Sequence, residues 1–268
     1  MSASAPGRVA PMPTKVRHLV IVLGDQLDAE SSAFDGLDAT QDVVWMAEVA
    51  EESTHVWSAK QRTVVFLSAM RHFAAELRER GLPVHYTALD DANNPGTLAA
   101  ALQQAIAALR PTGLVLTAPG DWRVLHSLRA VAAQHSLPLD LRDDTHFFST
   151  VREFAAHAQG RKQLRLEYWY RELRHKHGIL MEGKSPIAGQ WNFDADNRES
   201  FGKAGPKNVP PPTRFAPDAI TQEVIHLVST RFASHPGTLH SFGWPVTRAQ
   251  ALQALQAFIT AVSYTHLT

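Results

Sequence analysis

Short aliphatic runs recur along the first half of the chain, and stretches with helical spacing of their apolar residues separate them. Leu19–Leu23 is a continuous aliphatic run that stops at Gly24, a pattern typical of a strand buried on both faces. Strands that alternate with helices form parallel sheets, because each return crossing needs a connection of about helix length. The other runs are Val43–Val49, Val84–Leu89, Leu114–Leu116 and Leu137–Leu141, and the helical stretches are residues 63–80, 97–110 and 122–135.

The pattern predicts an α/β fold in residues 16–145, a Rossmann-like parallel sheet of five strands with helices on both faces. In such sheets ligands bind beyond the carboxyl ends of the strands. The sequence Gly24-Asp25-Gln26-Leu27 lies at this position, where glycine allows close approach and the polar side chains offer hydrogen bonds to a heterocycle. Glycine and aspartate also end many strands for turn reasons alone, so the bare motif leaves both interpretations open.

Composition excludes several classes of protein. The 268 residues contain 26 basic and 26 acidic side chains, so no global field attracts nucleic acid and any such binding needs a local patch. The absence of cysteine excludes disulfides, a thiolate nucleophile and thiolate-bound metal within this chain, and it is compatible with a cytoplasmic location. No run of 18 apolar residues predicts a membrane span, and residues 1–15 have the composition of a flexible tail.

The region from Arg161 to Arg198 combines basic and aromatic residues most densely. Residues 161–176 contain six lysine or arginine side chains and only two glutamates, and Tyr168-Trp169-Tyr170 lies among them. Cations that neutralise phosphates beside rings that stack on bases suit a nucleic-acid surface. An amphipathic helix with a solvated charged face would have the same composition. Residues 146–217 are therefore interpreted as a basic, aromatic helix followed by a linker.

The last part of the chain has helical periodicity again. Residues 221–232 carry apolar side chains on one face, and Thr247-x-x-Gln250 predicts the capped start of another helix. We interpret residues 218–262 as the start of an all-helical domain, because two helices are too few to bury their own apolar faces. Residues 263–268 break the alanine-rich pattern without a cap, so we expect them to be a non-native tail and the chain to be a truncated fragment.

Several of these segments resemble one family. EYWYRELRHKHGILM, followed by Pro186-x-x-Gly189-x-WNFDADNR, resembles the linker of the prokaryotic photolyase and cryptochrome-like proteins that carry an iron–sulfur cluster, the deoxyribodipyrimidine photolyase-related group. The Gly24–Leu27 turn, Ala47-Glu48-Val49 with Glu52, and Ser68–Phe73 follow in the order that this family shows. The resemblance covers roughly residues 18–261, and the WNFD…NR run is its most specific part.

The resemblance implies that the α/β domain is an antenna module that holds a ribityllumazine chromophore. Met46, Glu48 and Glu52 follow the second strand and could line the same crevice as the Gly24–Leu27 turn, with Glu52 as the preferred partner of the ligand. Residues 55–60 depart from the family's aromatic residue and His-His-Lys run, so we expect the edge of this pocket to differ from that of the family. The expected chromophore-binding residues are Gly24, Asp25, Gln26, Leu27, Met46, Glu48 and Glu52.

The resemblance also implies light-driven repair of pyrimidine dimers, with (6-4) photoproducts favoured, by a monomer that binds UV-damaged DNA. In this expected reaction excited reduced FAD passes an electron to a base flipped out of the duplex. The FAD pocket and the cysteines of a 4Fe-4S cluster lie downstream in the family, so no catalytic residue is assigned here and the fragment alone is expected to be inactive. Arg198 is expected nearest the lesion, with further DNA contacts from Arg161, Lys162 and Arg165. A cryptochrome-like photoreceptor is the alternative.

Two other patterns carry weaker signals. Gly178 to Ser185 matches the phosphate-binding pattern G-x-x-x-x-G-K-S, and a nucleotide hydrolase would use Lys184. The context is wrong, because a phosphate-binding loop follows a buried strand and opens a helix. The 14 histidines show no H-E-x-x-H spacing, so no metal site is predicted.

Overall fold

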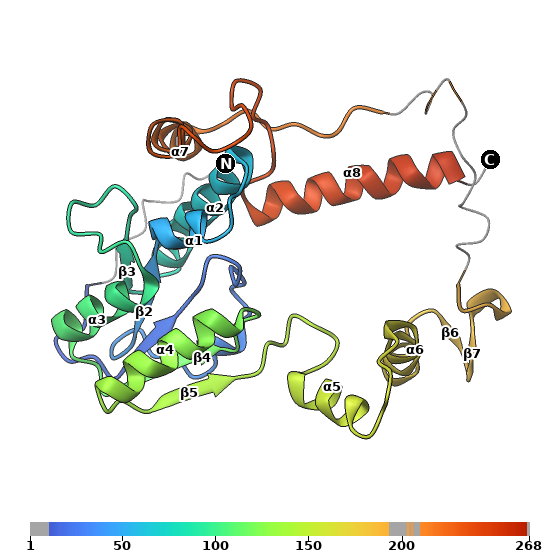
Figure 1. Cartoon of the computed structure of the whole chain (residues 1–268), viewed down its shortest axis with the longest axis horizontal. Coiled ribbons are helices and arrows are strands. Elements are labelled where there is room, and N and C mark those ends of the chain that lie inside the picture. Colours follow the sequence, from blue (N-terminus) through green and yellow to red (C-terminus); the bar gives the residue numbers. More distant parts are fainter. Residues whose placement is uncertain (1–10, 193–202, 204, 206–209, 267–268) are drawn as a thin grey trace, which may run out of the picture. The chain divides into compact units, whose positions relative to one another are not determined.

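The computed structural model describes residues 11–192, 203, 205 and 210–266. Five parallel strands form one sheet in the order β3-β2-β1-β4-β5, which confirms the predicted α/β class (Figure 1). Each strand falls within or close to an aliphatic run of the sequence. The strands are β1 (His18–Ile21), β2 (Val43–Ala47), β3 (Val84–Thr87), β4 (Gly113–Thr117) and β5 (Leu139–Arg142).

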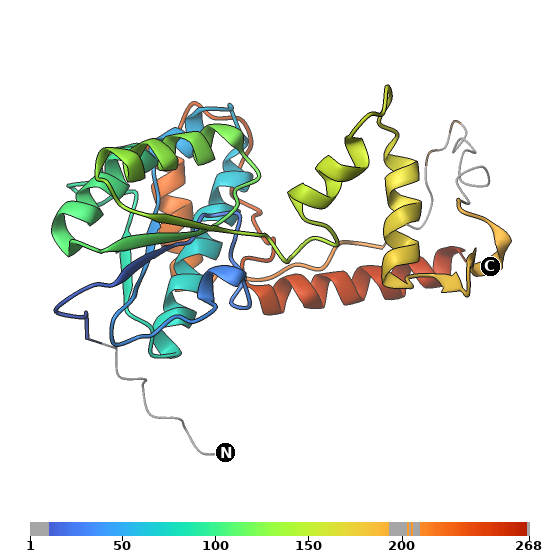
Figure 2. The same cartoon turned by 90° about the horizontal axis from the view of Figure 1, so that it is seen from below.

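Helices cover both faces of the sheet and create two apolar cores (Figure 2). On one face α3 (Leu98–Leu109) and α4 (Trp122–Gln134) pack against alternate strand residues such as Leu19 and Trp45. On the other face α2 (Lys60–Glu79) packs against Val22, Val44 and Met46. The alternation of side chains along a strand explains why Leu19–Ile21 of β1 and all of β2 are apolar, since both faces of these segments are buried.

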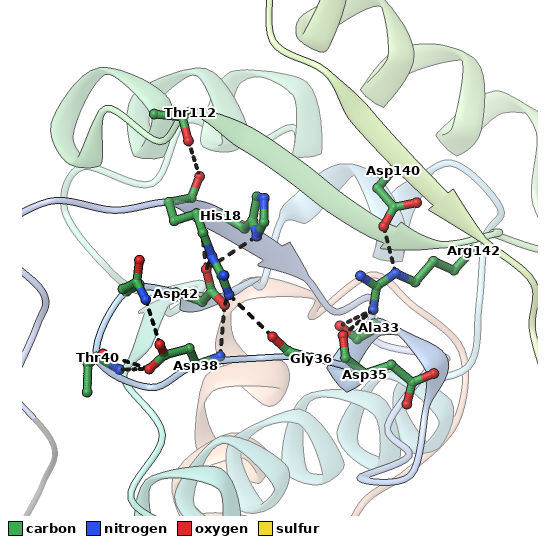
Figure 3. A network of polar contacts seen from close by, with 12 residues as sticks. His18, Ala33, Asp35, Gly36, Asp38, Thr40, Asp42, Thr112, Asp140 and Arg142 are labelled. Carbon is green, nitrogen blue, oxygen red and sulfur yellow. Dashed lines mark hydrogen bonds and ion pairs between the residues drawn. The ribbon is translucent and has the colours of Figure 1, made fainter.

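The first crossing, from β1 to β2, spans residues 22–42 and contains little regular structure. A single 3-10 turn, η1 (Ser32–Phe34), lies between β1 and β2, and α1 (Ala50–Thr54) precedes α2. A buried carboxylate, Asp42, fixes the chain just before β2 by accepting hydrogen bonds from the Arg17 guanidinium and from the backbone N–H groups of His18 and Asp38 (Figure 3). Burial alone would raise the pKa of Asp42, but these hydrogen bonds and the charge of Arg17 outweigh it and hold the pKa below its ordinary value.

α7 (Ala219–Arg231), which the sequence pattern assigned to a separate helical domain, packs against α2 of the α/β unit (Figure 1). Val224 and Val228 are fully buried in the core that α2 shares with the sheet. Asp218 caps the first turn of α7 and lies 2.9 Å from His72 of α2. The compact unit therefore comprises residues 11–142 together with residues 212–266 of the described chain. α7 packs on this unit because its apolar face must be covered by another apolar surface, and α2 provides that surface.

The final helix, α8 (Arg248–His266), begins as expected after Thr247, whose hydroxyl accepts a hydrogen bond from the backbone N–H of Gln250. It continues past residue 262, where the sequence pattern predicted an end. Its apolar side chains Leu252, Leu255, Phe258 and Ile259 are exposed. Of the helices that the structure describes, none has the length and hydropathy needed to cross a membrane.

The described residues between 143 and 211 form a second compact unit with its own elements. These are α5 (Val151–Ala158), α6 (Leu166–His177), the strands β6 (Met181–Glu182) and β7 (Ser185–Pro186), and η2 (Ile187–Gly189). The sequence predicted helical structure across residues 147–176, but the helix breaks at Gly160, which has a positive φ of 74°. A capping box between Thr150 and Glu153 starts α5, and Gly178 in the left-handed conformation ends α6.

Candidate functional site

A cavity of about 570 Å³ lies at the carboxyl ends of β1, β2 and β4, the edge of the sheet where ligands bind in this class of fold. Its volume is in the range of pockets that hold small ligands. The backbone segments after the three strands meet here because the strands are parallel and adjacent. The lining comprises Val22, Leu23, Gly24, Asp25, Ala47, Glu48, Val49, Glu52, Ser53, Ser58, Arg62, Thr63, Phe66, Leu67, Met70, Leu98, Pro119, Gly120, Asp121, Trp122 and Val124.

Of the seven residues expected to bind a chromophore, four line this cavity, namely Gly24, Asp25, Glu48 and Glu52. Gln26, Leu27 and Met46 do not. The side-chain amide of Gln26 donates to the backbone oxygens of Thr117 and Ala118 and so ties the first turn to β4. Met46 is fully buried on the α2 face of the sheet, and Leu27 packs against the same core. Met46 does not line the crevice as expected, because it lies within β2 and is fully buried, whereas Glu48 lies just beyond the end of the strand and reaches the cavity.

Glu48 lies at the cavity but its carboxylate is already bound. The guanidinium of Arg71 donates two hydrogen bonds to it, at 2.7 and 2.9 Å, and the hydroxyl of Tyr86 and the backbone N–H of Leu89 donate two more. The hydrogen bonds to Glu48 raise the pKa of Arg71. Burial, reinforced by the charge of Glu48, raises the pKa of Tyr86, so this hydroxyl stays protonated and donates. The Glu48 carboxylate thus holds β2, α2 and β3 together.

Glu52, the ligand partner that the sequence favoured, is engaged in an ion pair. Both of its carboxylate oxygens accept hydrogen bonds from Arg123 of α4, at 2.9 and 3.0 Å. Asp121 caps α4 by accepting a hydrogen bond from the backbone N–H of Arg123, and chiefly this hydrogen bond lowers the pKa of Asp121. The two carboxylates and Arg123 connect α1 with the start of α4 along one side of the cavity.

Most of the lining was not predicted from the sequence, including Arg62, Phe66, Asp121 and Trp122. The guanidinium of Arg62 lies over the ring of Phe66, 5.3 Å from its centroid, and donates to the hydroxyl of Ser58. Trp122 is 71% exposed although it lines the cavity. The sequence could have identified Asp121 as a lining residue, because Gly120-Asp121 follows β4 as Gly24-Asp25 follows β1. The positions of Arg62 and Phe66 depend on how α2 packs, which no local motif reveals.

Gly24 is required by close packing. A Cβ at this position would lie 2.9 Å from the sulfur of Met70 and 3.7 Å from the ring of Phe66. Both of these side chains also line the cavity. A side chain at residue 24 would therefore displace the cavity wall.

The expected DNA-contacting cations in the second unit differ in how they are held. Arg161 donates to the backbone oxygen of His157 and to the carboxylate of Glu172, so its guanidinium bridges α5 and α6. Lys162 and Arg165 are exposed, and neither makes an ion pair within the part of the chain that the structure describes. Arg198 lies outside the described residues. Lys162 and Arg165 are accordingly the described candidates with charge available for a phosphate.

Aromatic and basic side chains of α6 pack on one another. Trp191 lies 5.2 Å from both the Arg171 and the Arg174 guanidinium groups, measured to its ring centroid. Arg174 is buried and donates hydrogen bonds to the backbone oxygens of Ile179 and Leu180. Tyr168 and Tyr170 are each 46% exposed. Part of the basic, aromatic sequence is thus internal structure, and the two tyrosines keep ring surface available for stacking.

The G-x-x-x-x-G-K-S pattern does not form a phosphate-binding loop. Gly178 ends α6, and Met181–Glu182 pairs antiparallel with Ser185–Pro186 in a tight hairpin. No buried strand precedes the motif and no helix starts at Ser185 in this described segment. The backbone N–H groups that would surround a phosphate are therefore not arranged for it.

Comparisons with known proteins agree with the geometry. Residues 20–244 match the family described as Deoxyribodipyrimidine photo-lyase-related protein. The chain is also 44% identical over 243 residues to a (6-4) photolyase of Agrobacterium fabrum (strain C58 / ATCC 33970), an alignment that covers 90% of this chain and 47% of that protein. The chain therefore spans about half the length of the curated relative that it matches. Because the family match extends over most of the sheet-forming unit and the whole second unit, the chain belongs to the deoxyribodipyrimidine photolyase-related family.

Proposed function

We propose that the chain is part of a light-driven DNA repair protein that acts on (6-4) photoproducts, with the α/β unit as its chromophore-binding antenna. The 44% identity to the Agrobacterium fabrum (6-4) photolyase carries the choice of lesion. The cavity at the carboxyl ends of β1, β2 and β4 supports the antenna role. Family membership supports action on damaged DNA in general.

The residues of the cavity fit a chromophore of the ribityllumazine type. One part of the lining is apolar and aromatic, with Phe66, Leu67 and Trp122, and can contact a flat ring system. The remainder carries hydroxyl and charged groups, including Ser53, Ser58 and Thr63, that can bind the hydroxyls of a sugar-alcohol chain. A bound chromophore would supply absorption of light, while these residues bind it and keep it oriented.

The second unit would supply contacts to DNA. The exposed cations Lys162 and Arg165 precede α6, whose exposed Tyr168 and Tyr170 can stack on unpaired bases. Arg198 remains part of this proposal because the resemblance in the WNFDADNR run includes it. FAD and a 4Fe-4S cluster are the further cofactors proposed for repair. The cluster needs cysteine ligands, and these 268 residues contain none.

A chimera tests the proposal. Residues 20–244 of this chain, the range of the family match, would replace the aligned half of the Agrobacterium fabrum (6-4) photolyase. Blue light would then be applied to a duplex with a single (6-4) photoproduct, and restored dipyrimidine would be measured by chromatography, with the unmodified photolyase and dark samples as controls.

We expect light-dependent repair within about tenfold of the unmodified photolyase, because binding surfaces built from matching residues differ by small free energies. A folded, flavin-containing chimera that binds the lesion duplex without repairing it would favour the cryptochrome-like alternative. A folded chimera that does not bind the lesion duplex would contradict the DNA-repair proposal.

A further inference from the structure

The second compact unit is joined by polar contacts rather than by a large apolar core. Among its described residues between 143 and 211, three are buried, namely His157, Arg174 and Pro186. A histidine and an arginine thus occupy the kind of position that aliphatic side chains fill in the sheet-forming unit. The polar partners of these side chains therefore decide how α5 and α6 are joined.

His157 of α5 and Glu172 of α6 form the central contact. The side chain of His157 is 2% exposed, and its Nδ1 lies 2.8 Å from Oε2 of Glu172. The ring of Trp169 packs on the His157 ring with 4.6 Å between the two centroids. Because an ionised carboxylate only accepts, Nδ1 carries a proton and donates. This hydrogen bond is the main cause that lowers the pKa of Glu172, so the carboxylate is charged at neutral pH.

The second oxygen of the same carboxylate binds Arg161. Oε1 of Glu172 accepts a hydrogen bond of 3.0 Å from the Arg161 guanidinium, whose Nε also donates to the backbone oxygen of His157 at 2.6 Å. The side chains of Arg161 and Glu172 are 42% and 47% exposed, so solutes can reach both groups. Arg161 is thus held at the surface in a fixed orientation, with its charge balanced by Glu172.

Two cations that follow Arg161 in the sequence are not balanced in this way. Lys162 and Arg165 are exposed and make no ion pair within the described ranges. A phosphate can bind to either of them without displacing a carboxylate, whereas at Arg161 it must replace Glu172. Exposed ion pairs are weak, and a guanidinium binds phosphate and carboxylate with the same fork of donors. The exchange of Glu172 for a phosphate is therefore within reach of DNA binding.

We propose that Glu172 competes with DNA phosphate for Arg161 and thereby weakens binding to undamaged duplex, and that His157 positions Glu172 for this competition. The inference rests on the proposed DNA contacts of the second unit and adds a residue that limits them. Arg161 contributes its charge only where the DNA brings a phosphate close enough to replace the glutamate. Because phosphate contacts carry no sequence information, such a competitor lowers non-specific affinity.

The test is fluorescence anisotropy of the full chain with a short undamaged DNA duplex, measured at several salt concentrations. Glu172→Gln releases the guanidinium of Arg161 while keeping a side chain of similar size, and Arg161→Gln combined with it removes the released charge again. His157→Phe keeps a ring against Trp169 but removes the donor that orients the glutamate.

Glu182→Gln is the matched control. Glu182 is an exposed carboxylate of the same unit, and it has no ion-pair partner in the segments that the structure describes. The control therefore removes the same negative charge without releasing a cation. Limited proteolysis checks that α5 and α6 remain folded in each variant.

Relative to Glu182→Gln, we expect Glu172→Gln to bind the duplex about two- to fivefold more tightly, because only a weak exposed pair is removed. The slope of log affinity against log salt should steepen by about 0.9, since one more phosphate is neutralised. The double variant should return to the affinity and slope of Arg161→Gln, and His157→Phe should lie between the unmodified chain and Glu172→Gln. A purely structural role of Glu172 would leave the salt slope unchanged.

Equal affinity and slope in folded Glu172→Gln and Glu182→Gln would overturn the inference. If Glu172→Gln does not fold, an unchanged slope in His157→Phe would overturn it instead. The proposed DNA contacts of the unit would still stand if the unmodified chain binds the duplex and Lys162→Gln weakens that binding. If the unmodified chain and Glu172→Gln both fail to bind, the inference and these DNA contacts fail together, whereas repair is tested separately by the chimera.

Discussion

The carboxylate of Glu48 and the guanidinium of Arg71 form a two-point ion pair, with one oxygen–nitrogen distance of 2.7 Å and another of 2.9 Å. The side chain of Glu48 is fully buried and that of Arg71 is 15% exposed. Breaking a buried pair leaves an uncompensated charge. Glu48→Gln should therefore lower the free energy of unfolding by about 3 to 5 kcal/mol, as measured by urea denaturation.

The control for this pair is Arg80→Gln, because Arg80 forms an exposed pair with Glu76. Exposed pairs of this kind contribute about 1 kcal/mol or less. In a double-mutant cycle, Arg71→Met combined with Glu48→Gln should destabilise the chain by less than the sum of the single changes. If the losses in free energy of unfolding from the two single changes simply add in the double variant, the side chains of Glu48 and Arg71 do not stabilise each other.

The lowered pKa of Asp42 should make the stability of the folded chain depend on pH (Figure 3). Its pKa in the folded protein lies below the ordinary value of 3.8, so the unfolded chain binds the proton more readily. The stability that Asp42 contributes is therefore complete above about pH 5 and is lost as the pH falls through 3.8 and below. Asp42→Asn should be less stable than the unmodified chain at pH 7, and the difference should narrow by pH 3. A difference that stays constant between these pH values would contradict the assignment.

Replacing Gly24 by a residue with a side chain should have a steric effect on the cavity. In Gly24→Ala the new methyl group would lie 2.9 Å from the sulfur of Met70, and the flexible end of that side chain must move. We expect a loss of about 1 to 3 kcal/mol of stability and weaker ribityllumazine binding, measured by thermal unfolding and titration. The second change Met70→Ala should recover part of the binding by making room. Failure of Met70→Ala to recover any binding would argue against the proposed clash.

The two exposed cations before α6, Lys162 and Arg165, should contribute to the salt dependence of DNA binding. Arg165→Gln and Lys162→Gln should each weaken binding to duplex DNA and reduce the slope of log affinity against log salt by about 0.9 for each phosphate that is no longer neutralised. Arg80→Gln in the α/β unit is the control and should leave the slope unchanged. Fluorescence anisotropy at several salt concentrations measures both quantities, and an unaltered slope in the two variants would remove these residues from the interface.

The hairpin at Gly178–Ser185 predicts no nucleotide binding. Titration with magnesium and ATP should give no binding to the unmodified chain, and Lys184→Ala should behave identically, because the motif forms β6 and β7 instead of a phosphate-binding loop. Binding of ATP that depends on Lys184 would restore the nucleotide-hydrolase alternative.

The sheet could be predicted because its signal is local. Each buried strand, such as Leu19–Leu23, is apolar on both faces, and each turn residue follows directly in the sequence. The position of Gly24-Asp25 at the carboxyl edge followed from the same pattern. The cavity was thus predictable in place, since parallel topology alone decides which strand ends meet.

The state of the individual carboxylates could not be predicted, because their partners are distant in the sequence. Glu52 and Arg123 are 71 residues apart, and Glu48 and Tyr86 are 38 residues apart. Only the packed structure shows that both glutamates are already paired. The same limit applies to α7, whose helical period was visible while its docking on α2 was not.

Equilibrium dialysis of the unmodified 268-residue chain against 6,7-dimethyl-8-ribityllumazine measures whether the α/β unit binds a chromophore, as we propose. The bound compound would be quantified by absorbance after the protein is denatured. We predict saturable binding that approaches about one molecule per chain, since the cavity at the edge of the sheet has the required lining. Absence of saturable binding by the folded chain would contradict the proposed chromophore-binding role of the α/β unit.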